Sequence, residues 1–263
     1  MRLSISNIAW TSDNDKLMYG KMKELGFSGL EIAPTRIFPE NPYEKLDEAR
    51  DWSRQLKAEY GFCVPSMQSI WYGRTEMIFG TPDERKALVD YTKKAVDFAN
   101  VIGCKNLVFG CPRNRNMPEN AEFEIAVEFF KEIGDYAFSK GTVIGMEANP
   151  PIYNTNFVNY SKEAIKLIDE VDSKGFRLNF DMGTVVCLEE SLNILDGKSD
   201  LINHVHISEP GLKPIQARKS HAELAEMLRR ADYQGFVSVE MGKCDELSVV
   251  CEAMEYVAGV FRD

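Results

Sequence analysis

Short apolar runs alternate with longer amphipathic stretches along the 263 residues of this chain. The short runs predict buried β-strands, and the amphipathic stretches predict helices that cover a sheet. The predicted strands span residues 3–9, 29–33, 63–70, 106–110, 142–149, 176–182, 202–208 and 236–241. The predicted helices span residues 15–25, 43–60, 82–102, 122–139, 162–171, 189–194, 222–231 and 245–261, of which 189–194 has the weakest pattern. This order indicates eight βα units.

Glycines at the turns between helices and strands fit the same order. Gly26, Gly61, Gly103 and Gly235 each stand shortly before a predicted strand, where a left-handed glycine commonly ends a helix. Eight βα units can close into a barrel or form an open doubly wound sheet, but the open sheet usually brings a glycine-rich phosphate loop. None of the patterns GxGxxG, GxxxxGKS and GxxxxGKT occurs in the sequence. The sequence therefore predicts an α/β protein with a (β/α)8 TIM barrel, as a single domain over residues 1–263.

Composition and charge narrow the classes of partner. The formal net charge of −10 argues against nucleic acids and anionic membranes as main partners. No run is long and apolar enough to predict a membrane span, and the N-terminal residues lack the pattern of a secretory signal. The six cysteines form no CxxC pair and are typical of reduced thiols, so a cytoplasmic protein is expected. The sequence leaves a homo-oligomer open.

An ionisable side chain stands at the end of each of the last four predicted strands. These residues are Glu147, Asp181, His206 and Glu240. They follow one another at intervals of 34, 25 and 34 residues (147 to 181, 181 to 206 and 206 to 240), each about one βα repeat. Because side chains alternate along a strand, their apolar neighbours face the helices and the ionisable groups face the barrel interior. Active sites of TIM barrels lie at the C-terminal strand ends, so we expect the four groups to meet there.

A divalent metal ion explains this convergence. Three carboxylates in a barrel mouth repel one another and lose hydration, and a bound cation offsets both costs. Three oxygen ligands and one imidazole suit Mn²⁺, Mg²⁺ or Co²⁺ best, and Zn²⁺ is compatible with them. A lone acid at a strand end is commonly a solvated loop residue or a helix cap, but four at matched repeat positions favour a metal site.

The sequence around these residues resembles the xylose isomerase-like TIM barrels, a superfamily of sugar and sugar phosphate isomerases and epimerases. The resemblance covers nearly the whole chain and is most specific at GMEANP, FDMG, HVHISEP and VSVE, the segments that contain the four residues. It implies that Glu147, Asp181, His206 and Glu240 are the metal ligands. In the ketose 3-epimerases of the superfamily, the two ligand glutamates are also the acid and base pair, which here are Glu147 and Glu240.

The residues and the resemblance agree on the chemistry. Epimerising or isomerising a ketose removes a proton from a carbon next to a carbonyl, and a metal ion bound to the substrate oxygens stabilises the enediolate that forms. One carboxylate takes the proton and another returns it. The sequence thus predicts a metal-dependent isomerase or epimerase acting on a small sugar or sugar derivative. The alternatives are a metal-dependent dehydratase or lyase of an inosose- or dehydroshikimate-like keto-polyol, and a non-catalytic sugar-binding barrel.

Three positions depart from the ketose 3-epimerases. The substrate-binding histidine, arginine and second acidic residue of those enzymes correspond here to Thr184, Leu212 and Tyr153. The metal half of the predicted pocket therefore matches, whereas the substrate half differs. DNA-repair endonucleases share the fold but need a histidine-rich site for three metal ions, and this chain has only three histidines and an unfavourable charge for DNA.

Further residues near the predicted strand ends are candidates for substrate binding. They are Glu31, Gln68, Trp71, Arg113, Arg115, Asn149, His204 and Glu209. Gln68 and Trp71 would offer a hydrogen bond and a flat apolar wall to a sugar. Glu31 either lines the pocket or forms a buried ion pair. His204 lies one layer below His206, where it can orient a metal ligand.

Two arginines follow the fourth predicted strand. Arg113 and Arg115 either pair with a carboxylate or phosphate of the substrate or neutralise acids of the protein itself, such as Glu31 or Glu209. His221, which opens the seventh helix pattern, is predicted to be a helix cap or a loop residue.

Overall fold

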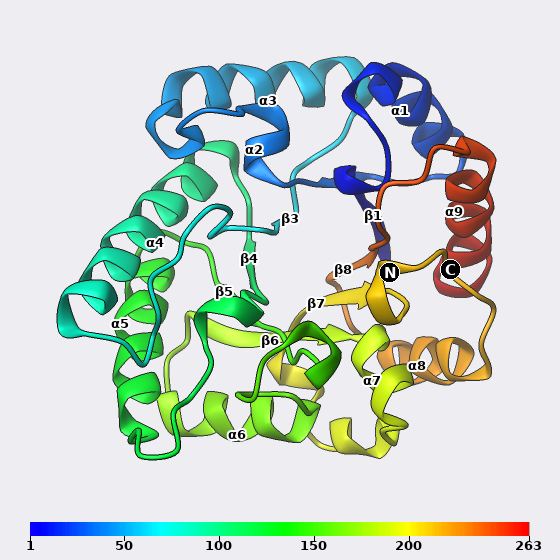
Figure 1. Cartoon of the computed structure of the whole chain (residues 1–263). Helices are drawn as coiled ribbons and strands as arrows, with labels where there is room; N and C mark the ends of the chain where they lie inside the picture. The colour runs from blue at the N-terminus through cyan, green and yellow to red at the C-terminus, as the bar shows by residue number, and fades with distance from the viewer. Residues whose placement is uncertain (263) are drawn as a thin grey trace.

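A computed structural model describes residues 1–262 and has eight parallel strands enclosed by helices (Figure 1). The strands are β1 (Arg2–Ser6), β2 (Gly29–Glu31), β3 (Ser66–Met67), β4 (Asn106–Phe109), β5 (Ile144–Met146), β6 (Phe176–Asp181), β7 (Ile202–Ile207) and β8 (Phe236–Val239). The α-helices are α1 (Asp15–Glu24), α2 (Pro34–Ile37), α3 (Leu46–Tyr60), α4 (Pro82–Ile102), α5 (Glu124–Ser139), α6 (Ser161–Val171), α7 (Met182–Leu188), α8 (Lys219–Arg230) and α9 (Leu247–Phe261). Short 3-10 turns fill several of the connecting loops.

The sheet closes into a barrel. Hydrogen-bonded neighbours follow the order β2-β1-β8-β7-β6-β5-β4-β3. The two ends of this order are joined by isolated parallel bridges, from Gly29 to Cys63 and from Ile32 to Met67. The (β/α)8 TIM barrel predicted from the alternating pattern is therefore confirmed, and the C-terminal strand ends share one mouth.

The chain forms this barrel because strands and helices present matching apolar surfaces. Leu3, Ile5 and Val237 of the strands are almost fully buried, as are Leu88 and Phe98 of α4. These residues belong to one continuous hydrophobic core between the barrel and its helices. The apolar pattern predicts where the strands and amphipathic helices lie because each helix buries one face against the barrel.

Helix ends agree with the sequence signals except at one glycine. Gly26, Gly61 and Gly103 have positive φ angles of 76°, 79° and 73°, as expected at helix C-termini. The same prediction is wrong for Gly235, because Asp232 takes the left-handed conformation there, with φ 51°. A side chain at Gly235 would instead collide with the ring of Tyr233.

Several elements differ from the predicted ones: the strand expected at 142–149 is reduced to β5, and the short helix α2 was not predicted. The strand expected at 63–70 is reduced to β3, where Pro65 supplies no N–H to the ladder. The helix expected at 189–194 is wrong: α7 begins directly after β6, and two 3-10 turns, Leu192–Leu195 and Ser199–Leu201, follow it. The early start arises because Asp181 at the end of β6 caps α7.

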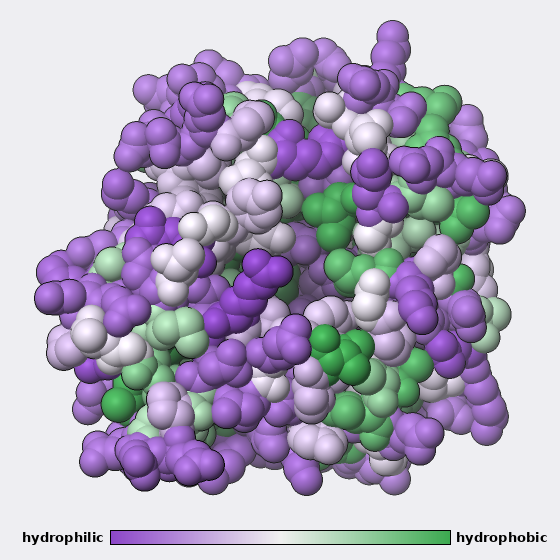
Figure 2. Space-filling model, viewed as in Figure 1, coloured by the Kyte–Doolittle hydropathy of each residue, from purple (hydrophilic) through white to green (hydrophobic). Residues whose placement is uncertain are grey.

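The outer surface is largely polar. Figure 2 shows hydrophilic residues over most of the face that looks into the barrel mouth, with a hollow near its centre. All six cysteines are free thiols. Within residues 1–262, no helix is long and apolar enough to cross a bilayer.

Candidate active site

Three of the four predicted metal ligands converge in the barrel mouth. His206, on β7, places its Nδ1 atom 2.8 Å from Glu147 Oε2 and 3.1 Å from Glu240 Oε2. Glu147 follows β5 and Glu240 follows β8. In the sheet order, β8 lies on one side of β7, and β6 and β5 lie on the other. One ligand atom from each of the three residues lies within 4.8 Å of the others. All three side chains are buried.

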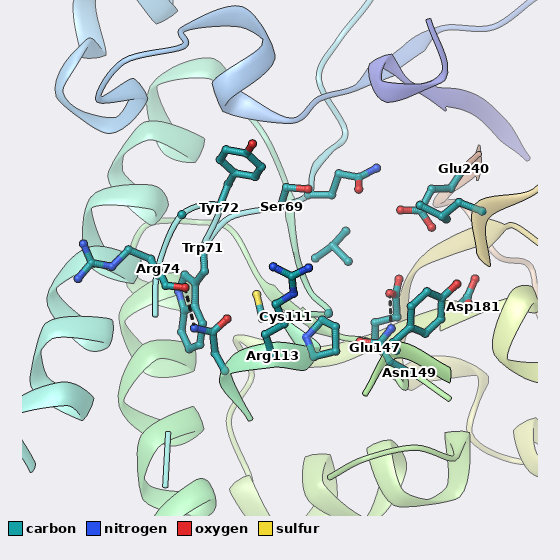
Figure 3. Close-up of a pocket in the computed structure, with 18 of the residues that line it drawn as sticks. Ser69, Trp71, Tyr72, Arg74, Cys111, Arg113, Glu147, Asn149, Asp181 and Glu240 are labelled. Atoms are coloured by element: carbon teal, nitrogen blue, oxygen red, sulfur yellow. Dashed lines mark hydrogen bonds between the residues drawn. The ribbon is translucent and has the colours of Figure 1, made fainter. Parts of the chain in front are cut away.

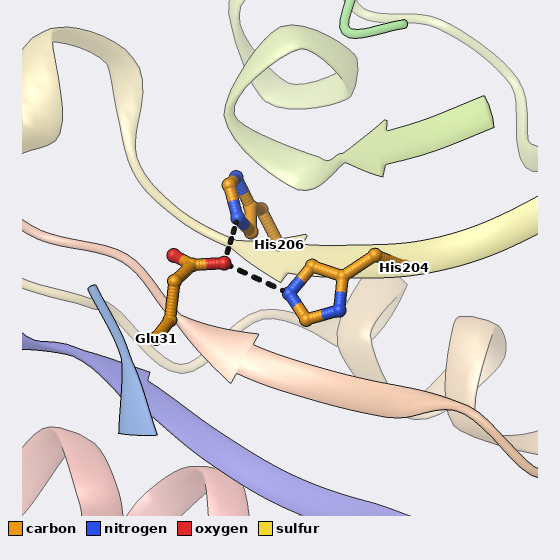
Figure 4. A group of neighbouring side chains, drawn as sticks. All are labelled: Glu31, His204 and His206. Atoms are coloured by element: carbon orange, nitrogen blue, oxygen red, sulfur yellow. Dashed lines mark hydrogen bonds and ion pairs between the residues drawn. The ribbon is translucent and has the colours of Figure 1, made fainter. Parts of the chain in front are cut away.

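A carboxylate behind the imidazole sets its orientation. His206 Nε2 lies 3.0 Å from Glu31 Oε2, and His204 Nε2 lies 3.0 Å from the same oxygen (Figure 4). Burial by itself raises the pKa of Glu31, but the two histidines reverse this effect and hold that pKa well below its usual range. An ionised Glu31 accepts the Nε2–H of His206, so the Nδ1 atom faces Glu147 and Glu240 and would bind a metal ion after giving up its own proton.

Glu31 and His204, which were predicted to bind the substrate, lie beneath the pocket and not in its lining. Glu31 is 0% exposed and His204 is 1% exposed, and neither lines the pocket. The alternative interpretation of Glu31, a buried ion pair, is what the structure shows. The inward direction of both side chains was correct, but they lie one layer below the pocket floor.

Replacing Glu31 by glutamine should weaken metal binding without removing a ligand. Loss of such an orienting carboxylate typically lowers metal affinity by about 10- to 100-fold, and we expect a loss of that size for Mn²⁺ in isothermal titration calorimetry. The matched control is Glu209→Gln, another buried acid of the barrel mouth, which should lower the melting temperature and leave the affinity unchanged. Equal affinities for wild type and Glu31→Gln would show that Glu31 does not position His206.

The fourth predicted ligand, Asp181, lies beside the group and caps α7. Its Oδ1 atom accepts hydrogen bonds from Ser208 Oγ (2.5 Å) and from Gly183 N–H (3.2 Å). Its Oδ2 atom accepts from Thr184 N–H (2.7 Å). The Thr184 hydroxyl lies 2.9 Å from Oδ2 but 2.7 Å from the carbonyl oxygen of Ala148. The single hydroxyl proton can serve only one of these two oxygens, and when it serves the carbonyl, Oδ2 keeps a lone pair for a further partner.

The charge balance of this cluster suits a divalent cation. Burial raises the pKa of Glu147, Asp181 and Glu240. The negative charge of a neighbouring carboxylate raises the pKa of each one further. Burial alone would lower the pKa of His206, but Glu240, Glu31 and Glu147 raise it well above its usual value. An excess of negative charge therefore surrounds a cation-sized position, and the donor set of oxygens and one imidazole nitrogen fits a hard divalent metal ion.

The carboxylates of Glu147, Asp181 and Glu240 form one end of a pocket of about 630 Å³ (Figure 3). Four of the predicted substrate-binding residues line it, namely Gln68, Trp71, Arg113 and Asn149. Asn149 Nδ2 donates to Glu147 Oε1 at 3.0 Å, so it also fixes a catalytic candidate. The volume lies within the range of about 300–1,000 Å³ that is typical of small-molecule sites.

Arg115 and Glu209 lie outside the pocket, contrary to the prediction. Arg115 is 0% exposed and donates to the carbonyl oxygens of Glu147 (2.9 Å) and Val158 (3.2 Å). Glu209 is paired with Arg218 at 2.5 Å. Neither arginine of the fourth loop pairs with Glu31 or Glu209, the two acids named as examples, but the buried charge of Arg115 interacts with Glu147 and Glu163. Arg115 donates to those carbonyl oxygens because a buried guanidinium must satisfy its donors locally, and the loop carbonyls offer the nearest acceptors.

Some pocket residues were not predicted to bind the substrate. Tyr153 and Leu212 were named only as positions that differ from the ketose 3-epimerases, and others were missed. Tyr153 and Leu212 both line the pocket, and the hydroxyl of Tyr153 accepts a hydrogen bond from Gly211 N–H at 2.9 Å. This contact links the loop after β5 to the loop after β7 beside the metal ligands. Ser69 was not predicted; its φ of 54° is the signal, but it is visible only in the structure.

His221 is not a cap or a loop residue. It lies inside α8, is 0% exposed, and has its Nδ1 atom 3.1 Å from the hydroxyl of Tyr256 on α9. Burial lowers the pKa of His221 to about 4. It is therefore a neutral packing residue between two outer helices.

A sequence profile described as xylose isomerase-like TIM barrel matches residues 20–257, which include all four predicted metal ligands. The chain belongs to the xylose isomerase-like TIM barrel family. Membership agrees with the closed barrel and with the positions of Glu147, Asp181, His206 and Glu240 at successive strand ends. No curated protein sequence matches the chain.

Solved structures resemble this xylose isomerase-like barrel over its whole length. The 3-keto-D-glucoside 4-epimerase of E. coli has a TM-score of 0.78 at 21% identity, over 98% of this chain and 99% of that one. D-Psicose 3-epimerase of Clostridium cellulolyticum H10, solved with D-tagatose, has a TM-score of 0.79 at 17% identity over 100% of both chains. A family 2 AP endonuclease of Brucella melitensis has 0.73 at 16% identity, over 100% and 97%. At these identities the likeness shows the fold alone.

Proposed function

We propose that this protein is a metal-dependent isomerase or epimerase of a small sugar or sugar derivative. The observation that carries the proposal is the convergence of Glu147 and Glu240, which come from different strand ends and each place a carboxylate oxygen close to His206 Nδ1, at 2.8 and 3.1 Å. Two carboxylates with raised pKa values around one reactive position are suited to move a proton off and onto a substrate carbon. The sugar epimerases among the structural neighbours support this choice.

The residues would divide the work as follows. One of the two glutamates takes a proton from the carbon next to the substrate carbonyl, and the other returns a proton from the opposite face. Asn149 and Asn179 donate to Glu147 at 3.0 and 2.7 Å and hold its carboxyl group in place. Trp71 and Leu212 line the pocket with apolar surface, which keeps water away from the reacting carbon.

A divalent ion fits the donor set described above. Glu147, Asp181, His206 and Glu240 would hold it, with Asp181 using the free lone pair of Oδ2. Mn²⁺, Mg²⁺ and Co²⁺ are the ions that three oxygens and an imidazole favour, and Zn²⁺ is compatible. When bound, such an ion polarises a carbonyl and stabilises the negative charge that develops on its oxygen.

Deuterium exchange tests the proposed reaction directly. Purified protein loaded with Mn²⁺ is incubated in D₂O with ketoses, ketose phosphates and keto-polyols, and carbon-bound deuterium is followed by NMR. Incorporation without loss of water supports the proposal. Deuterium incorporation coupled to loss of a β-hydroxyl group would identify a dehydratase instead. If the protein neither binds metal nor exchanges any substrate, both activities are excluded and a binding function remains.

A further inference from the structure

The pocket has a second wall that the proposed proton transfer does not use. The first wall carries Glu147, Asp181 and Glu240, and the opposite wall is built by the loops after β3 and β4. Residues 69–75 and 111–114 supply this second wall. Figure 3 shows Arg113 on that side, pointing into the open space between Tyr72 and the carboxylates.

Arg113 is the unpaired cation of the pocket among the residues that the structure describes. Its side chain is exposed, and within residues 1–262 it forms no ion pair and no hydrogen bond. The other arginine in the pocket lining, Arg74, differs: it is paired with Glu76 and stacks on Tyr91, with its guanidinium carbon 4.8 Å from the ring centre.

The backbone that presents Arg113 is firmly held. Asn114 donates from its side-chain amide to the carbonyl oxygens of Arg74 (3.2 Å) and Glu76 (2.8 Å). The carbonyl oxygen of Asn114 accepts from Ile78 N–H at 2.9 Å. On the same loop, Arg115 is buried against the backbone of Glu147. The loop is therefore fixed on both walls, while the guanidinium of Arg113 itself remains free to contact a ligand.

We propose that Arg113 binds an anionic substituent, a carboxylate or a phosphate, on the sugar whose carbon is attacked at the Glu147–Glu240 pair. This proposal rests on the proposed function and specifies its substrate class. A guanidinium fork matches the planar oxygens of either anion. The carboxylate wall repels such a group, so the anion would lie at the opposite wall, where the hydroxyl group of Ser69 lies on the same side as Arg113 (Figure 3).

Three ketoses that differ only at carbon 6 test this specificity: D-fructose, D-fructose 6-phosphate and D-fructuronate. Deuterium exchange by the Mn²⁺-loaded protein should show a higher kcat/KM for at least one of the two anionic sugars. Arg113→Gln should lower that kcat/KM by about 10- to 100-fold, mainly through KM, and leave D-fructose unchanged. Preference for the phosphate or for the carboxylate identifies the anion. Equal kcat/KM values for the three sugars, or an unaffected Arg113→Gln variant, would overturn the proposal.

The matched control is Arg54→Gln, which removes the same charge from an exposed position on α3. Arg54→Gln should behave as wild type, so a general effect of net charge is separated from a local one. Arg113→Lys keeps the charge and loses the fork, and it should recover part of the preference.

A binding measurement separates failure of this proposal from failure of the proposed reaction. Calorimetric titration of the Mn²⁺-loaded protein with D-glucuronate, D-glucose 6-phosphate and D-glucose requires no turnover. Arg113-dependent binding of an anionic sugar, without exchange of any ketose, would contradict the isomerase function and support the anion site. Binding that is identical in wild type and Arg113→Gln would contradict the anion site, whatever the exchange data show.

Discussion

Replacing Glu147 or Glu240 by glutamine is expected to lower the rate of deuterium incorporation by about 10²- to 10⁴-fold, the usual contribution of a positioned acid or base. The amide cannot take a proton from carbon and also weakens the metal site. Because the two glutamates act as a unit, the double variant should be little slower than either single one. NMR exchange rates on an accepted substrate measure the effect.

These variants should remain folded, which distinguishes a catalytic role from a structural one. Burial raises the pKa of both carboxyl groups, so their ionised forms destabilise the metal-free fold at neutral pH, and this cost decreases as pH falls. The neutral amides should therefore give a melting temperature at or above that of the metal-free wild type. Glu128→Gln, at an exposed position on α5, is the control. Full activity in either variant would remove that glutamate from the proposed reaction.

Removing the metal ion is expected to abolish exchange and lower stability together. A ligand present at a hundred times its Kd stabilises the folded state by about 2.7 kcal/mol. For a chain of this size, each kcal/mol corresponds to about 2–4 °C in melting temperature. Treatment with EDTA should therefore lower the Tm by roughly 5–11 °C relative to Mn²⁺-saturated protein, and added Mn²⁺ should restore both Tm and exchange.

The Glu147→Gln/Glu240→Gln double variant provides the control for this experiment. It lacks two of the proposed ligand oxygens, so its Tm should respond weakly to Mn²⁺. Exchange that survives exhaustive chelation, with a Tm that is the same with and without Mn²⁺, would exclude a metal-dependent mechanism.

The sequence predicted the barrel and much of the site because both depend on regular periodicity. Residues at the ends of successive strands must share the barrel mouth, so the meeting of Glu147, His206 and Glu240 followed from their spacing. Alternation along β7 also placed His204 and His206 on the same inward side. These inferences need only the strand positions, which buried apolar runs mark clearly.

Depth and loop direction could not be predicted in the same way. Whether Glu31 lines the pocket or lies beneath it depends on the stagger between β2 and β7, which no single segment encodes. Arg113 and Arg115 are separated by one residue, yet one is exposed and the other is fully buried. The exposure of each arginine depends on the loop conformation around Asn114. That conformation is held by hydrogen bonds from the Asn114 side chain to the carbonyl oxygens of residues 74 and 76.

The contact of Arg115 with the backbone of Glu147 has a consequence for engineering this protein. Under the proposed function, it separates two positions of one loop: Arg113, which would affect the choice of substrate, and Arg115, which would support the chemical step through Glu147. Libraries that randomise residues 69, 72 and 113 should shift selectivity while retaining turnover, because none of these residues holds a ligand carboxylate. A library that included residue 115 should contain mostly inactive members, since the loss of its buried hydrogen bonds would displace a proton-transferring group.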